Sequence, residues 1–437
     1  MSFSGNKKTE YEKCLSEMFA LRRFGIILGL ETIKKILESI GNPQDRFASV
    51  HIAGTNGKGS IASGLAAVLR AAGYHVGLYT SPHLVRFNER IKINNLEISD
   101  QEVLEAYKAV RNAEYGDREP TFFEYTTAMA FHYFSHCKVE WAIIETGMGG
   151  RMDATNILNP AVSVISNLSL EHQMYLGDTL TAIAAEKGGI IKHATPVVTG
   201  VRQKQALTVL KNIADSKSAS LYRLGGDFRV RRKKGNRFSY FGIDHIWRDL
   251  RIGLQGDHQI ENAAVVLAVC ELLMKERDNF PALDIPQKSI QEGLENNRWP
   301  GRLEQILAAP LVILDGAHNL SAVRNLSKYM ADNLSHRRIT LVAGILDDKS
   351  YEPMLQKLLP NCSRVILTRS RIDRSLEPEK LYPIARRYVS DVTIIHDVGK
   401  AVQHAIQTAS PDEAVCIAGS LYVVGEARAF FEEAGMV

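Results

Sequence analysis

The chain has 437 residues, of which 45% are hydrophobic and 23% charged, and its formal net charge is +4. This length exceeds what one hydrophobic core holds comfortably, so two domains are expected, and the composition is ordinary for a soluble globular protein. The small net charge gives no argument for a nucleic-acid partner, although it suits an anionic substrate.

The sequence carries no targeting or membrane signal. No apolar run reaches the ~18 residues that a membrane span needs, and the first letters, MSFSGNKKTEYEKC, lack the apolar centre of a signal peptide. The five cysteines are scattered and form no CxxC pair, which is typical of free thiols in a reducing compartment. We therefore expect a cytoplasmic monomer with no membrane or nucleic-acid partner.

The N-terminal part begins with helices and then alternates strands with helices. Residues 10–40 are predicted to be helical with a break at 22–29, where Gly25 and Gly29 interrupt the apolar pattern. Apolar runs then predict strands at 48–53, 75–79, 139–145, 161–166, 196–199 and 220–222. Helices are predicted at 61–72, 99–114, 121–136, 179–190, 203–216, 262–275 and 286–296, and a polar loop at 81–90.

The pattern changes at 227–254, where alternation around a turn predicts small antiparallel hairpins. The basic run 229–237 is interpreted as a solvated hairpin face, with a nucleic-acid patch as the alternative. After a boundary at 297–301, strands at 311–314, 339–343, 364–367, 392–395 and 414–418 alternate with helices at 320–334, 351–359, 378–389, 400–408 and 421–434. The predicted fold is α/β: an N-terminal P-loop domain (1–297) with a mostly parallel sheet and the hairpins, and a smaller C-terminal Rossmann-like domain (298–437).

A glycine-rich turn, GTNGKGS, joins the first predicted strand to the helix that follows it. In such a turn backbone N–H groups surround a phosphate at a helix N-terminus, where the helix dipole also favours negative charge. Lys58 would offer a positive charge to the terminal phosphates, and Ser60 a hydroxyl to magnesium. The spacing is unusual because Gly59 separates the lysine from the serine, and a plain turn is the alternative.

Polar residues follow several predicted strands, where ligands bind in open α/β sheets. Glu145 ends one strand and suits a magnesium ligand beside a phosphate loop, with an ordinary strand-end acid as the alternative. Asp315 and His318 follow a strand of the second domain and either face a crevice between the domains or form an exposed N-cap cluster. For His172 the residues leave a structural and a ligand role open, and Lys187 is typical of a surface lysine. Residues alone thus predict a magnesium-dependent nucleotide enzyme.

The motifs resemble those of the Mur ligase superfamily, and closely those of its folylpolyglutamate synthase/dihydrofolate synthase family. The resemblance runs through nearly the whole chain, in the segments GLETIKKIL, HIAGTNGKGS, YTSPHLVRFNERI, TFFEYTTAMAF, IIETGMGGRMDATN, SLEHQMYLGDTLTAIAAEKGGI, PGRLE, ILDGAHN and IAGSLYVVGEA. The peptidoglycan ligases carry Thr at the position of Gly59. Mild departures from the family pattern are Glu171 in place of Asp, Gly188 after the lysine, and Met152 in place of Leu. None removes an implied ligand, and they bear only on loop geometry.

The resemblance implies a role for each matching residue. ATP would contact Gly54, Thr55, Asn56, Gly57, Lys58, Gly59, Ser60, Asn262, Arg302 and Asp315. One Mg²⁺ ion would be held by Ser60, Ser81 and Glu145, and a second by His172, with carbamylated Lys187 as a carboxylate-like metal ligand. The first substrate would contact Arg22, Arg23, Thr121, Phe122, Phe123, Glu124, Met152, Asp153 and Ala154. Catalytic roles fall to Lys58, Lys187 and His318.

The implied activity is ATP-dependent addition of L-glutamate to dihydropteroate, to reduced folates, or to both. ATP phosphorylates a carboxylate, and the glutamate amine attacks the acyl phosphate to give an amide, ADP and phosphate. Domain closure about 297–301 would exclude water from this intermediate. The alternatives are a monofunctional folylpolyglutamate synthase, a peptidoglycan ligase, and a nucleotide-binding regulatory protein whose ligase chemistry is lost.

Overall fold

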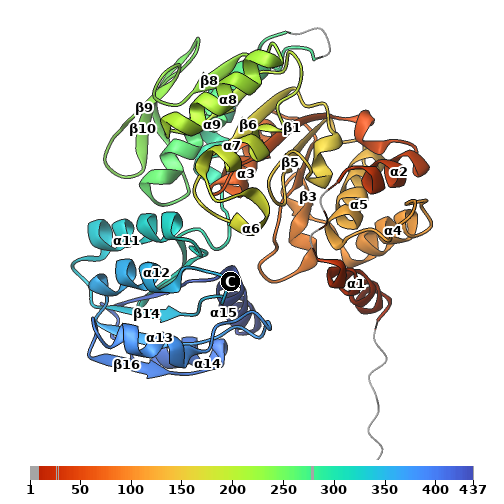
Figure 1. The fold of residues 1–437 in the computed structure, drawn as a ribbon. Coiled ribbons are helices and arrows are strands. Elements are labelled where there is room, and N and C mark those ends of the chain that lie inside the picture. Colours follow the sequence, from red (N-terminus) through yellow and green to blue (C-terminus); the bar gives the residue numbers. More distant parts are fainter. Residues whose placement is uncertain (1–8, 26, 28, 277–279, 437) are drawn as a thin grey trace, which may run out of the picture.

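The computed structural model of the chain describes residues 9–25, 27, 29–276 and 280–436. It contains two α/β bodies, and the C-terminal one lies at the lower left of Figure 1, in blue. The first letters of the sequence predict that there is no signal peptide, and most of these residues lie outside the described ranges. Among the helices of the described ranges, none is both long and apolar enough to cross a membrane.

The N-terminal body is built on an eight-stranded sheet in the order β4-β3-β2-β5-β1-β6-β7-β8. The strands are parallel except where β3 pairs with β2 and β4. Its strands are β1 (Ala48–Ala53), β2 (Val76–Tyr79), β3 (Ile91–Ile93), β4 (Leu96–Glu97), β5 (Trp141–Glu145), β6 (Val162–Ile165), β7 (Val197–Thr199) and β8 (Leu221–Arg223). The central strands are mostly apolar and almost fully buried because helices cover both faces of this sheet.

Helices cover the two faces of the sheet, and alternate residues of β1 enter different cores. Ile52 packs in a core with α3, α9 and α10, whereas Ala53 packs with α7 and α8. A third core joins the face of β5 that carries Ile144 to α1, α2, α4 and α5. The helices are α1 (Glu10–Ala20), α2 (Glu31–Ser39), α3 (Lys58–Ala71), α4 (Asp100–Arg111), α5 (Phe122–His136), α6 (Gln173–Leu176), α7 (Leu180–Gly188), α8 (Lys204–Ser216), α9 (Asp257–Leu273) and α10 (Gln287–Asn296).

The predicted hairpins form a separate antiparallel sheet of β9 (Arg229–Arg232), β10 (Arg237–Phe241) and β11 (Ile246–Arg251). The buried carboxylate of Glu271, on α9, anchors this sheet. It accepts hydrogen bonds from the Tyr240 hydroxyl at 2.6 Å and from the His245 backbone N–H at 2.6 Å. The basic side chains of the run 229–237 are exposed, in keeping with a solvated hairpin face.

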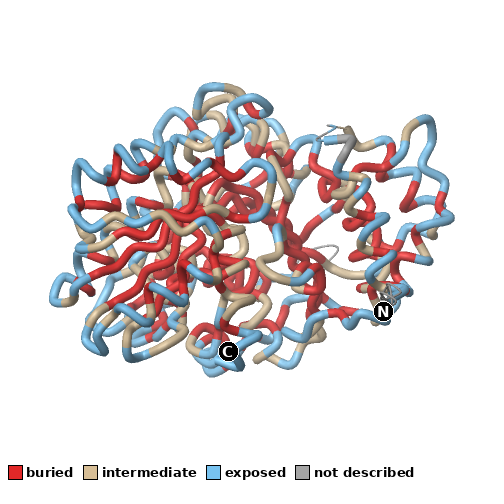
Figure 2. The backbone as a smooth tube through the Cα atoms, turned by 90° about the horizontal axis from the view of Figure 1, so that it is seen from below, coloured by how far each residue is buried: buried red, intermediate tan, exposed pale blue. Residues whose placement is uncertain are grey.

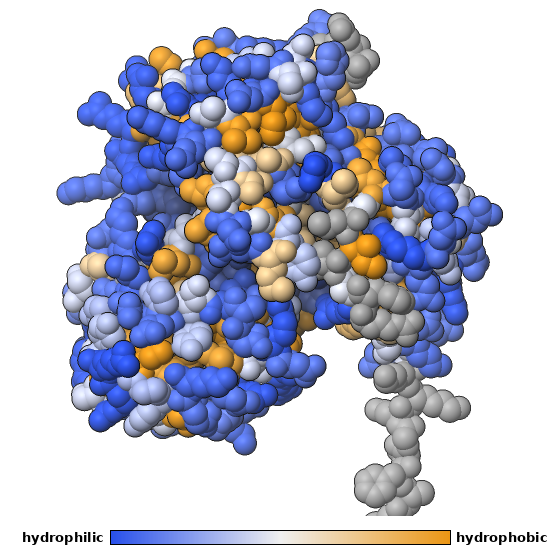
Figure 3. Space-filling view, viewed as in Figure 1, coloured by the Kyte–Doolittle hydropathy of each residue, from blue (hydrophilic) through white to orange (hydrophobic). Residues whose placement is uncertain are grey.

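The C-terminal body holds a six-stranded sheet in the order β12-β13-β17-β14-β15-β16, in which only β12 is antiparallel to its neighbour. Helices α11 to α13 pack on one face and α14 and α15 on the other. The elements are β12 (Glu304–Ala308), β13 (Leu311–Asp315), α11 (Leu320–Leu334), β14 (Ile339–Ala343), α12 (Tyr351–Leu358), β15 (Arg364–Leu367), α13 (Pro378–Ala385), β16 (Asp391–Ile394), α14 (Val398–Thr408), β17 (Ala414–Ala418) and α15 (Leu421–Glu433). Figure 2 shows buried backbone inside both bodies and exposed loops outside, and most of the face in Figure 3 is hydrophilic.

The predicted fold class is confirmed, and so are all the predicted long helices and buried strands. Four predictions need correction. The polar loop ends in a 3₁₀ turn, Phe87–Arg90, and is followed by the short strands β3 and β4. Helix α6 and strand β12 were not predicted. Helix α3 begins at Lys58 rather than at residue 61, and α9 begins at Asp257 rather than at residue 262. The missed elements are two to five residues long, too short for a hydrophobic period to be recognised. The boundary between 297 and 298 stays a prediction.

Candidate active site

The glycine-rich turn lies between the end of β1 and the start of α3, for which Gly57 is the N-cap residue. Gly54 and Gly57 have φ values of +146° and +85°, which favour glycine. A Cβ atom at Gly54 would lie 1.8 Å from the Ser166 hydroxyl oxygen, so no side chain fits there. The same hydroxyl donates to the backbone carbonyl of Asn56 at 2.7 Å. The end of β6 therefore fixes the shape of this phosphate loop.

Lys58 and Glu145 face each other across the loop. The Lys58 ammonium lies 3.8 Å from the Glu145 carboxylate and donates to the Thr55 carbonyl at 3.3 Å. Glu145 ends β5, the strand beside β1, and accepts the Ser81 backbone N–H at 3.2 Å. Burial raises the pKa of the Glu145 carboxyl, whereas the charge of Lys58 opposes that shift. Carboxylate and serine oxygens are the ligands that Mg²⁺ prefers.

Lys187 lies beneath the phosphate loop. It belongs to α7, is only 4% exposed, and donates from Nζ to the Gly54 carbonyl at 2.8 Å. The interpretation of Lys187 as a surface lysine, made from the residue pattern, is therefore wrong. Burial and the nearby Lys58 charge lower the pKa of its amine to about 7. Because a buried ammonium is poorly solvated, the neutral amine is favoured here.

The side chain of His172 lines the same cavity as the loop, at the N-terminal end of α6. Burial lowers the pKa of its imidazole to about 4, so the ring is neutral at physiological pH. A neutral imidazole is the form that binds a metal ion. This environment is compatible with the ligand role that the residues alone left open.

The second domain completes the cavity from the opposite side. Asp315 ends β13 and accepts the backbone N–H groups of Leu303 at 2.9 Å and Ala317 at 3.0 Å. Burial raises the pKa of the Asp315 carboxyl, and the nearby Arg302 guanidinium lowers it. Of the predicted nucleotide, metal and catalytic residues, all but Gly54 and Lys187 line this one cavity: Thr55, Asn56, Gly57, Lys58, Gly59, Ser60, Ser81, Glu145, His172, Asn262, Arg302, Asp315 and His318.

Two charged residues that sequence reasoning did not assign to the site cross the space between the domains. Glu171 is 9% exposed in its side chain, and its carboxylate lies 3.2 Å from His318 Nε2 and 3.5 Å from Lys349 Nζ. Burial opposes ionisation of Glu171, but the contact with His318 and the neighbouring cations lower its pKa. Lys349 lies shortly after β14, so the strand-end rule that found Asp315 would also have found it.

The predicted substrate segments adjoin this cavity through aromatic rings. The Arg22 guanidinium lies 4.8 Å from the ring centroid of Phe122, at the start of α5. The ring of the next residue, Phe123, packs so closely on Gly147 that a Cβ there would meet it at 2.6 Å. Since Gly147 also lines the cavity, the Phe123 ring adjoins it. The predicted contact of the Arg23 side chain lies outside the described residues.

The two predicted substrate carboxylates already have protein partners. Glu124 is 2% exposed, and its carboxylate accepts hydrogen bonds from two guanidinium nitrogens of Arg118, at 2.7 and 2.9 Å. It also accepts a hydrogen bond from the Thr121 backbone N–H. Asp153 is 5% exposed and accepts the Thr155 hydroxyl at 2.6 Å. Both side chains hold their segments in place. Beside Asp153, Met152 is exposed and Ala154 is buried.

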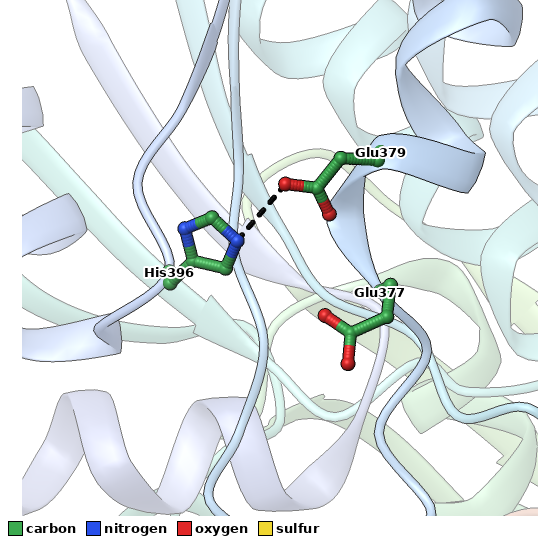
Figure 4. Close-up of side chains that lie close together, drawn as sticks. All are labelled: Glu377, Glu379 and His396. Atoms are coloured by element: carbon green, nitrogen blue, oxygen red, sulfur yellow. Dashed lines mark ion pairs between the residues drawn. The ribbon is translucent and has the colours of Figure 1, made fainter.

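Outside the cavity, three side chains of residue types that often bind metal ions lie close together: Glu377, Glu379 and His396 (Figure 4). All three side chains are exposed, and their partners are found at the surface. Glu379 contacts His396 at 3.0 Å, and Glu377 contacts Arg369. These surface ion pairs account for the cluster.

Two family models match the chain: the Mur ligase middle domain over residues 52–270, and the Mur ligase glutamate ligase domain over residues 301–421. Dihydrofolate synthase/folylpolyglutamate synthase of Bacillus subtilis is 34% identical, over 96% of this chain and 99% of that protein. The structure of Escherichia coli FolC in complex with DHPP and ADP has a TM-score of 0.88 at 27% identity, covering 97% of this chain and 98% of its own. Bifunctional folylpolyglutamate synthase/dihydrofolate synthase of Yersinia pestis, complexed with AMPPNP and a Mn ion, has a TM-score of 0.86 at 28% identity, covering 97% of this chain and 98% of its own.

Proposed function

This chain belongs to the Mur ligase family, in its folylpolyglutamate synthase/dihydrofolate synthase group, and from that premise we propose that it is an ATP-dependent ligase that joins L-glutamate to dihydropteroate, to reduced folates, or to both. The observation that carries the proposal is one cavity shared by the phosphate loop, with Lys58 and Glu145, and by Arg302 and Asp315 of the second domain. The names of the relatives add the substrate class.

The nucleotide would bind with its phosphates on the loop and its remaining parts against Asn262, Arg302 and Asp315. Phosphoryl transfer needs positioning and charge neutralisation more than covalent chemistry. Lys58 and the N–H groups at the start of α3 meet that need. A divalent cation, when bound, neutralises charge on the transferred group. We assign its ligands to oxygens of Ser60, Ser81 and Glu145, a donor set that fits Mg²⁺.

A second cation site is assigned to His172 and to a carbamate on Lys187. In forming the carbamate, the neutral Lys187 amine bonds to the carbon of CO₂ and releases one proton, leaving a negatively charged oxygen ligand. Support comes from the burial of Lys187 and from its pKa of about 7, which leaves much of the amine unprotonated at neutral pH. Bound cations stabilise a carbamate once it is formed.

The ligation then runs in two steps. The substrate carboxylate takes the γ-phosphoryl group of ATP, which forms an acyl phosphate and ADP. The glutamate amine attacks the acyl carbon, the bond to phosphate breaks, and the amine loses a proton as the amide forms. Water would hydrolyse the acyl phosphate, so the contact of Glu171 with His318 and Lys349 is assigned to closing the cavity. The pterin-bearing substrate is placed beside Phe122 and Phe123, whose aromatic faces suit a flat ring.

The test is phosphate release from ATP with magnesium and L-glutamate, with dihydropteroate and tetrahydrofolate as alternative acceptors. Turnover with both acceptors is the expected result and means a bifunctional enzyme. Turnover with tetrahydrofolate alone identifies the monofunctional folylpolyglutamate synthase. A folded protein that binds ATP but turns over neither acceptor would contradict the ligase and favour the regulatory protein. Cytoplasmic location and a monomeric state stay predictions.

A further inference from the structure

An asparagine from each domain meets its counterpart across the cavity. Asn56 belongs to the phosphate loop, and Asn319 is the N-cap residue of α11 in the second domain. Asn319 Nδ2 donates to Asn56 Oδ1 at 2.9 Å, and Asn56 Nδ2 donates to Asn319 Oδ1 at 3.3 Å. The two amides therefore satisfy each other reciprocally, without any charge. Asn319 is only 8% exposed and Asn56 is half-buried, so this pair is partly shielded from competing water.

This amide pair joins the N-terminal ends of two helices. Asn56 directly precedes Gly57, the N-cap residue of α3, and Asn319 Oδ1 also caps α11 by accepting the Ala322 N–H at 2.9 Å. Each helix N-terminus carries a partial positive charge. Bringing two such ends together is unfavourable when the space between them is empty, and favourable when an anion fills it.

Cations strengthen the same effect, because Lys58 and Arg302 line the same cavity as Asn56. The backbone of Asn56 is held by its own domain, since its N–H donates to Asn167 Oδ1 at 2.9 Å and its carbonyl accepts from Ser166 at 2.7 Å. Only the Asn56 side chain therefore depends on the second domain. A neutral contact at this point ties the domains together without adding to the charge that the phosphates must balance.

We propose that Asn319 is a positioning residue that fastens the second domain onto the phosphate loop when polyphosphate occupies the cavity. Pairing with Asn56 holds the N-terminus of α11 over the anion and keeps Arg302 and Asp315 in place beside the nucleotide. The inference rests on the proposed function only in taking the anion to be the phosphate chain of ATP.

The decisive variant is Asn319→Ser, because serine also caps a helix but its side chain is too short to reach Asn56. Loss of two neutral hydrogen bonds is expected to lower kcat/KM for ATP about 5- to 150-fold. Asn56→Ala should lose at least as much, because Asn56 also belongs to the phosphate loop, and adding Asn319→Ser to it should cost little more, because both variants remove the same interaction. The control is Asn333→Ser, the same change on an exposed position of α11, which should match the parent.

A second measurement follows closure without catalysis: the radius of gyration by small-angle X-ray scattering, with and without ADP and magnesium. We expect ADP to give a compact parent protein and a more expanded Asn319→Ser variant. If the parent lacks ligase activity but shows this difference, the proposed function fails and the closure role stands. Three results would overturn the role: parental kcat/KM and compaction in Asn319→Ser, losses that multiply in the double variant, or impairment in Asn319→Ala but not in Asn319→Ser.

Discussion

Lys58 is the residue on which the phosphate loop depends most directly. Its ammonium faces the cavity and lies 3.8 Å from the Glu145 carboxylate, and both side chains are largely buried. Lys58→Ala removes the positive charge offered to the phosphates and leaves Glu145 without its cation. We expect a fall of at least ~100-fold in glutamate-dependent phosphate release, by analogy with the loss of one transition-state donor. The measurement is steady-state kinetics, beside circular dichroism that confirms the fold. Lys34→Ala, at an exposed position, is the control, and a nearly active Lys58→Ala would contradict the loop assignment.

The carbamate on Lys187 has its own chemical test. Lys187→Ala deletes the amine beneath Gly54 and leaves a buried gap where an anionic ligand is proposed. We expect turnover to fall sharply and to recover in part when formate or acetate is added, because a small carboxylate takes the place of the carbamate oxygens. The same acids should not rescue Lys58→Ala. A fully active Lys187→Ala enzyme would end the carbamate hypothesis.

The buried ring of His51 in β1 contributes to the dependence of stability on acid pH. Its Nε2 lies 2.7 Å from the Thr155 hydroxyl, and burial lowers the pKa of its imidazole from 6.5 to about 3. Between these values the unfolded chain binds a proton that the folded chain does not. Stability therefore falls as the pH drops from about 6.5 towards 3, by up to ~1.4 kcal/mol per pH unit from this residue.

The corresponding variant is His51→Gln, whose amide can still donate to Thr155 but does not titrate. Urea unfolding at about pH 7, 5.5 and 4.5, which covers the upper half of the titration window, should give a shallower loss of unfolding free energy than in the parent. Parallel pH dependences for the two proteins would show that His51 does not carry the effect.

At the scale of elements, the start of α3 is fitted to the connection between the domains. A Cβ atom at Gly59 would lie 2.9 Å from the indole nitrogen of Trp299, which follows α10. Gly59→Ala is expected to destabilise the protein by about 1–3 kcal/mol, as overpacking does in a dense interior. In a Trp299→Leu background the same change should cost less, because the ring it meets is gone. Denaturant unfolding of the four proteins measures this, and equal costs in both backgrounds would contradict the fit.

The elements that could be predicted are those whose signal is local. β1 and β5 are mostly apolar because both faces of their sheet are covered, α9 is a long apolar helix, and α11 is a long helix with one buried face. β12 has no such signal, since it exists only as the antiparallel partner of β13. Whether a segment pairs with another strand depends on tertiary structure, which five residues of sequence do not reveal.

The candidate site divides in the same way. Glu145 and Asp315 were found because strand ends in parallel sheets meet at one edge. Lys349 follows a strand and could have been found by the same rule. The contacts of Glu171 and Asn319 with the other domain could not be predicted, because they depend on how the two domains face each other. The arrangement of the two domains leaves no periodic pattern of apolar and polar residues from which it could be predicted.

Besides the contacts of Glu171 with His318 and Lys349, two further kinds of contact join the domains over the cavity, and we expect them to contribute differently to closure. Inside lies the pair of Asn56 and Asn319, in which Asn319 is buried and Asn56 is half-buried. Outside, the ammonium of Lys328 on α11 contacts the carboxylate of Asp257 on α9, and their side chains are 56% and 46% exposed. Exposed ion pairs contribute between zero and about 1 kcal/mol, because water and salt screen the attraction.

Lys328→Ala is therefore expected to change kcat/KM for ATP by less than about fivefold, which is the factor that ~1 kcal/mol gives. Raising the salt concentration to about 1 M, where the Debye length is ~3 Å, should remove what difference there is. Asn319→Ser should differ in both respects, with a larger loss that persists in salt, because its lost contacts carry no charge. Measuring both variants at low and high salt separates the two contributions. A larger, salt-sensitive loss in Lys328→Ala would instead place the closure energy in surface charge.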